Sequence, residues 1–230
     1  MSPLDDLLDS IFGSKKPEFY SEFVGWVRES RRFKAFATTY STKIRSKLNN
    51  VRDEGGIKDL RAELETASIL LREERFALEY EKYTALKQRG PDYTVTFKTH
   101  TLFNVEVRRI RNVELGDGDN EARINKLMAV VCDKVGQMPP SIVNVLWLIA
   151  EREVSETDLN RATLTLRQLA ERKTEDFFTR RGFKNATDFL KQYSQLSGIA
   201  LRQKDTNTVW QNSLARHKIP PEIINAIKRL

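Results

Sequence analysis

The chain has 230 residues, of which 31% are charged, and its formal net charge of +7 at pH 7 favours an anionic partner. Its length suits one larger domain, or one ordinary domain with an appendage. The single cysteine, Cys132, excludes an intramolecular disulfide, and with only two histidines a zinc cluster is not expected. The longest apolar run, around residues 143–150, is too short to span a bilayer, and the acidic N-terminus lacks the basic segment of a secretory signal. We therefore expect a cytoplasmic protein with no membrane partner.

Residues 3–52 are predicted to be helical, because aromatic and aliphatic residues recur there at three- and four-residue intervals. Within this region, residues 26–52 hold eight basic side chains and one acidic side chain, so this span alone carries a charge of +7. Two interpretations are open: a surface that contacts phosphate, or a helix face that lies in water. The side chains proposed for nucleic-acid binding are Arg28, Arg31, Arg32, Lys34, Lys43, Arg45 and Lys47.

A Gly-Gly pair at 55–56 is the clearest break in the chain and predicts a joint between helices, which ends an N-terminal helical region at 1–55. The next helix, over 57–73, has a stripe of leucine and alanine with Glu63 at its edge, while Glu65 lies well round the helix. A carboxylate at a core-facing edge needs a partner, so Glu63 is the candidate functional residue and Glu65 the reserve. The alternative is a partly exposed glutamate without a function.

Three strands are predicted from alternating apolar and polar side chains, at residues 75–83, 93–97 and 103–108. The polar KTHT segment between the last two suits a hairpin that closes near Thr99. A helix follows over 120–136, and the apolar run over 141–150 predicts a strand buried on both faces, as is typical of a parallel partner in an α/β sheet. Loops are expected at 84–90 and 113–120.

The remaining residues are predicted to be accessory. Ser155 and Asp158 have the spacing of a capping box at the start of a helix, and Asn185 is expected to cap another. Two short strands are predicted at 197–203 and 207–212, and a last helix at 221–229.

The hairpin carries three polar residues at motif spacing. Side chains two apart on a strand share a face, so Glu106 and Arg108 should point the same way, and Asp92 should come near them from the outer end of the preceding strand. Pro91-Asp92 followed by Glu106-Val107-Arg108 resembles the motif of the PD-(D/E)xK nuclease superfamily, with arginine in place of the motif lysine.

The predicted element order over 57–150 matches the core order of that superfamily and extends the resemblance to this range. The resemblance implies an α/β fold with a mixed central sheet flanked by helices, the restriction-endonuclease-like core. It would follow the N-terminal helical region at 1–55 and would occupy 56–230, with accessory helices at the C-terminal end.

The resemblance further implies a Mg²⁺- or Mn²⁺-dependent endonuclease whose catalytic residues are Asp92, Glu106, Arg108 and Glu63. Asp92 and Glu106 would bind the metal through carboxylate oxygens, which suit Mg²⁺. The motif lysine helps to deprotonate water and stabilises charge, but Arg108 can do only the second, because a guanidinium keeps its proton. If Arg108 instead pairs with Glu106 or Asp92, the site holds no metal and does not cleave.

Three functions are therefore open. The first is a metal-dependent nuclease that acts on nucleic acid, with DNA favoured over RNA. The second is a nuclease-fold protein that has lost catalysis and binds nucleic acid, and the third is a protein-interaction domain. Metal binding separates the first from the others, and salt-dependent affinity for nucleic acid separates the second from the third. The oligomeric state is open, a homodimer included.

Overall fold

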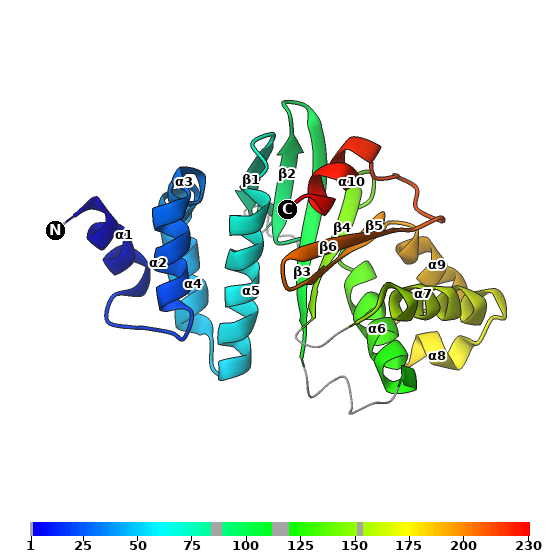
Figure 1. Ribbon diagram of the computed structural model, residues 1–230. Helices are drawn as coiled ribbons and strands as arrows, with labels where there is room; N and C mark the ends of the chain where they lie inside the picture. The colour runs from blue at the N-terminus through cyan, green and yellow to red at the C-terminus, as the bar shows by residue number, and fades with distance from the viewer. Residues whose placement is uncertain (1, 84–88, 112–119, 151–153) are drawn as a thin grey trace.

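The computed structural model describes residues 2–83, 89–111, 120–150 and 154–230. In this part of the chain, one six-stranded mixed sheet is covered by helices on both faces (Figure 1). This confirms the predicted α/β class with a mixed central sheet. Most residues of the two loops expected at 84–90 and 113–120 lie outside the described residues.

The strands follow one another across the sheet in chain order: β1 (Phe76–Tyr80), β2 (Tyr93–Phe97), β3 (Thr101–Ile110), β4 (Val143–Ala150), β5 (Gly198–Gln203) and β6 (Thr206–Gln211). The first three pair antiparallel, β4 and β5 add in parallel, and β6 returns antiparallel. Phe97 pairs with Thr101, so the β2–β3 hairpin turns through the three residues centred on Thr99, as predicted. The predicted strands at 75–83, 93–97, 103–108 and 141–150 are confirmed, with their ends shifted by a few residues.

The first five helices pack on one face of the sheet: α1 (Pro3–Phe12), α2 (Tyr20–Glu29), α3 (Arg31–Thr39), α4 (Ser41–Asn50) and α5 (Glu54–Leu70). Their apolar side chains form one hydrophobic core with the side chains of β2 and β3 that point to this face, among them Tyr93, Val95 and Val105. α10 (Pro221–Lys228) joins the same core. The predicted helical character of residues 3–52 is thus confirmed, and this region shares its core with the sheet.

The predicted joint at Gly55 and Gly56 is wrong by a few residues. Both glycines lie in the first turn of α5, and the break between α4 and α5 comes at residues 51–53. Asp53 is the N-cap, and its carboxylate accepts a hydrogen bond from the backbone N–H of Gly56 at 2.7 Å. This cap offsets the low helix propensity of glycine, which costs about 1 kcal/mol per residue.

The opposite face of the sheet carries α6 (Asn120–Val135), α7 (Glu156–Glu171), α8 (Glu175–Thr179) and α9 (Ala186–Tyr193), which surround a second hydrophobic core. β4 serves both cores, because Val145 and Trp147 point to the first and Leu146 and Leu148 to the second. The predicted strand buried on both faces is therefore confirmed. The capping box at the start of α7 and the Asn185 cap of α9 are also present.

The helices of the described residues are all too short or too polar to cross a membrane.

Candidate active site

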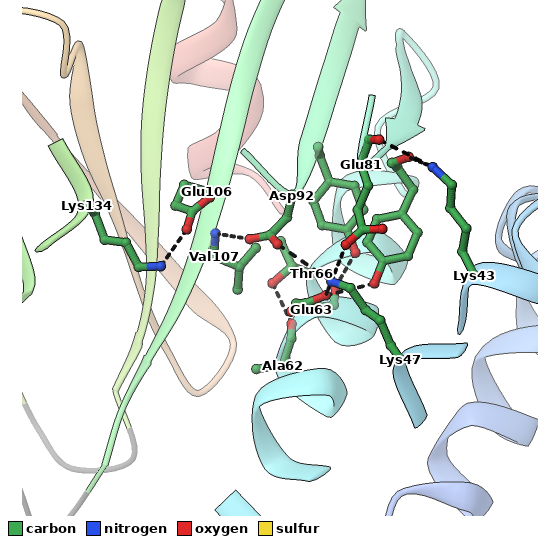
Figure 2. Close-up of polar contacts among 12 residues, drawn as sticks. Lys43, Lys47, Ala62, Glu63, Thr66, Glu81, Asp92, Glu106, Val107 and Lys134 are labelled. Atoms are coloured by element: carbon green, nitrogen blue, oxygen red, sulfur yellow. Dashed lines mark hydrogen bonds and ion pairs between the residues drawn. The ribbon is translucent and has the colours of Figure 1, made fainter. Parts of the chain in front are cut away.

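The candidate site begins where β2 and β3 separate. Tyr93 pairs with Val105, so Asp92 stands opposite Glu106, just beyond the last ladder pair. At this point a side chain continues the bonding between the two strands: Oδ2 of Asp92 accepts a hydrogen bond from the backbone N–H of Val107 at 2.8 Å (Figure 2). This bond holds the Asp92 carboxylate against β3, so the structure brings Asp92 and Glu106 together, as the hairpin register predicted.

Glu106 points to the face of the sheet that α6 covers. Its side chain is 8% exposed, and Oε1 accepts a hydrogen bond from Nζ of Lys134 at 2.7 Å. Burial raises the pKa of Glu106, and the Lys134 ammonium opposes this rise. The cation beside Glu106 thus comes from the last turn of α6, 28 residues along the chain.

Nothing in the strand motif pointed to Lys134. A signal for it was nevertheless present, because it lies between the buried residues Val131 and Val135 at the edge of the apolar stripe of α6. The same reasoning about edge position singled out Glu63 on its helix.

Arg108 and its neighbour Arg109 both line the cavity that Glu106 also lines. Nε of Arg109 pairs with Oδ1 of Asp59 at 2.9 Å. The sequence suggested Arg108 as the ionic partner of Glu106 and Asp92. Among the described residues, Lys134 pairs with Glu106, and the ammonium of Lys47 lies beside Asp92.

Glu63 reaches the site from α5 and lines its cavity, whereas Glu65 is not part of the lining. Oε2 of Glu63 accepts hydrogen bonds from Nζ of Lys47 at 2.6 Å and from the Tyr80 hydroxyl at 2.8 Å. Glu65 instead pairs with Arg61, one turn earlier on the same helix. The carboxylate at the edge of the apolar stripe therefore has the partners that its position required.

Lys47 lies between three carboxylates that come from separate segments (Figure 2). Its ammonium is 2.6 Å from Glu63 Oε2, 2.8 Å from Glu81 Oε1 and 3.9 Å from Asp92 Oδ1. It also lies 4.9 Å from the centre of the Tyr80 ring. Burial acts to lower the pKa of Lys47, but the carboxylates of Glu63 and Asp92 outweigh burial and raise it.

A cavity of about 200 Å³ unites most of these residues, and its lining consists of Asp59, Glu63, Asp92, Glu106, Val107, Arg108, Arg109 and Lys134. Burial raises the pKa of Asp92 well above its usual range, and the nearby carboxylates of Glu63 and Glu106 raise it further. Lys47 and the N–H of Val107 act in the opposite direction. A further cation beside Asp92 would neutralise this negative charge and favour the charged form of its carboxyl group.

Asp92 and Glu106 are the two carboxylates that the sequence predicted as metal ligands, and both line this cavity. Within the described ranges, no group of three or more histidine, cysteine, aspartate or glutamate side chains is arranged to hold a metal ion.

Four of the seven basic residues proposed for nucleic-acid binding make contacts within the protein. Nη1 of Arg32 donates to the carbonyl oxygens of Leu71 and Glu73 at 2.6 and 2.7 Å, just beyond the end of α5. Lys43, Arg45 and Lys47 likewise bond to other parts of the chain. Arg28 and Arg31 are exposed and Lys34 is partly exposed, so the surface available to phosphate is narrower than the sequence suggested.

Comparison of the chain with protein-family models, curated proteins and solved structures finds no match.

Proposed function

We propose that the protein is a metal-dependent nuclease with a restriction-endonuclease-like core, which hydrolyses phosphodiester bonds in nucleic acid, DNA in preference to RNA. One observation carries this proposal: Asp92, Glu106 and Lys134 line a single cavity, and the ammonium lies 2.7 Å from the glutamate. Two carboxylates and a lysine are the residue types of the PD-(D/E)xK motif. Here the lysine comes from a helix in place of the β3 position that Arg108 occupies.

The carboxylate pair suits Mg²⁺ or Mn²⁺. Mg²⁺ is usually bound through one or two carboxylates, and waters and substrate phosphates complete its coordination. Asp92 and Glu106 would hold such an ion. Burial, and after it the neighbouring carboxylates, raise the pKa values of both carboxyl groups, and a bound cation would favour their charged forms. A bound ion would neutralise negative charge on the phosphate oxygens and would lower the pKa of a water molecule bound to it.

Lys134 and Arg108 divide the work of the motif lysine in this proposal. The Lys134 amine can exchange a proton with water, and its ammonium stabilises negative charge that develops on the phosphate. Arg108 lines the same cavity and keeps its proton, so it acts as a charge clamp for a phosphate oxygen.

The substrate class rests on charge. The chain has a net charge of +7, and the exposed Arg28 and Arg31 with the partly exposed Lys34 provide cations for a phosphate backbone.

A second function is favoured by one specific observation. Glu63, Asp92 and Glu106 each already have a lysine beside them, so the same fold would also serve a protein that binds nucleic acid and does not cleave it.

The test combines Mn²⁺ calorimetry with nicking of supercoiled plasmid DNA in the presence of Mg²⁺. The variants are Glu106→Ala, Lys134→Met and, as a control, Lys191→Met, which removes an exposed lysine from α9. We expect the parent and the control to bind metal and nick DNA, Glu106→Ala to lose both, and Lys134→Met to bind metal but nick far more slowly. A parent that binds DNA with strong salt dependence, takes no metal and does not nick would establish the second function.

A further inference from the structure

Lys47 has surroundings that resemble those of a bound ion. Glu63 reaches its ammonium from α5, Glu81 from the end of β1 and Asp92 from the start of β2 (Figure 2). The Tyr80 ring lies beside the same ammonium, with its hydroxyl bonded to Glu63. Three oxygen donors and an aromatic face thus converge on one nitrogen atom.

The charges around Lys47 are not balanced by it alone. A single positive charge faces three carboxylates, so a doubly charged ion would neutralise this group more completely. The three carboxylates as they stand do not form a metal site. Two of their oxygens nevertheless lie near ligand distance, because the ammonium nitrogen is 2.6 and 2.8 Å from Glu63 and Glu81, whereas Asp92 is at 3.9 Å. Mg²⁺ prefers contacts of about 2.1 Å, so these two side chains would need to move inward by only about half an ångström or slightly more.

Asp92 connects this group to the cavity. Its Oδ2 is held by the N–H of Val107, its Oδ1 faces Lys47 at 3.9 Å, and its side chain lines the cavity together with Glu106. In two-metal phosphodiesterase sites, two ions about 3.5–4 Å apart act together on the attacking and leaving oxygens. Asp92 lies between two cation positions, the ammonium of Lys47 and the cavity, and a carboxylate shared in this way is typical of such a pair of ions.

We propose that Lys47 occupies the position of a second metal ion, so that the site takes a single divalent cation, held by Asp92 and Glu106. This inference rests on the proposed function. Lys47 is a positioning residue in it, which fixes Asp92 and Glu63 through their carboxylates and excludes an ion from the space between them.

Calorimetry with Mn²⁺ tests the proposal by the number of ions bound, independently of cleavage. The variant is Lys47→Met, which keeps the aliphatic length of the side chain and removes the charge. The control is Lys43→Met, one turn earlier on α4, because the Lys43 ammonium bonds to the backbone carbonyls of Tyr80 and Glu81. We expect one Mn²⁺ in the parent and in Lys43→Met, and two in Lys47→Met. The second ion should give the electron paramagnetic resonance signal of coupled Mn²⁺.

A folded Lys47→Met protein that binds only one Mn²⁺ would overturn the inference and leave the proposed function intact. If the parent binds no Mn²⁺, the proposed function fails, and with it the single ion at Asp92 and Glu106. The exclusion of a cation by Lys47 is then tested by itself: one ion bound by Lys47→Met supports it, and none overturns it. If Lys47→Met does not fold without metal, refolding in Mn²⁺ supports the inference, because the ion restores the missing charge. Failure to refold with Mn²⁺ overturns it.

Discussion

Replacement of Lys134 by methionine should destabilise the protein and should do so in a pH-dependent way. The Lys134 and Glu106 side chains are 16% and 8% exposed, so solvent screens their ion pair only weakly. At 2.7 Å and an effective dielectric constant of about 20, the attraction between the two charges is about 6 kcal/mol before desolvation is counted. Removal of one partner from a buried pair costs about 3–5 kcal/mol, and we expect a loss near about 3 kcal/mol because Glu106 can take up a proton.

The pH dependence follows from the same proton. Burial already raises the pKa of Glu106, and loss of Lys134 removes the group that opposes this rise. A carboxyl group whose pKa is higher in the folded than in the unfolded protein binds more protons when folded, so stability falls as pH rises between the two pKa values. In Lys134→Met, the free energy of unfolding should therefore decrease with a slope that approaches about 1.4 kcal/mol per pH unit above roughly pH 4.3, until the folded pKa is reached.

Urea denaturation of the parent and Lys134→Met at about pH 5 and about pH 8 measures this effect. The double variant Lys134→Met with Glu106→Gln serves as the control, because it has no charge left to bury and should recover stability and lose the added pH dependence. A loss below about 1 kcal/mol at both pH values would refute the reasoning, since it is the cost expected of a solvent-exposed pair.

Three further predictions concern activity, binding and local structure. In the plasmid assay, Lys134→Met should lower nicking by about 10²–10⁴-fold, the usual contribution of a group that transfers protons, whereas Arg108→Lys should change it far less; the reverse order would make Arg108 the working residue. Joint replacement of Arg28 and Arg31 by alanine should flatten the salt dependence of DNA binding by about 0.9 for each lost contact, as titrations at several salt concentrations would show; an unchanged slope would assign both side chains to water. Asp53→Ala should lower the free energy of unfolding by about 1 kcal/mol, measured by urea denaturation, because α5 loses its N-cap; no change would mean that the cap is not needed.

Much of the fold could be predicted from the sequence, because secondary structure depends on neighbours within a few residues. Alternation of apolar side chains located β2 and β3, and the continuous apolar run located β4. Part of the site followed from the same local rules. The hairpin register brought Asp92 opposite Glu106, and the apolar stripe of α5 distinguished Glu63 from Glu65.

The two lysines of the site were decided by tertiary structure alone. Lys134 reaches Glu106 only because α6 packs on the face of the sheet to which that glutamate points. Lys47 was predicted as a phosphate contact, yet the packing of α4 beside α5 places it among three carboxylates. A charged side chain on a helix has the same local pattern whether it faces water or a buried carboxylate, and only the element packed against it distinguishes the two. For the same reason, the sequence determined which residues are charged, and the tertiary structure decided which of those charges meet.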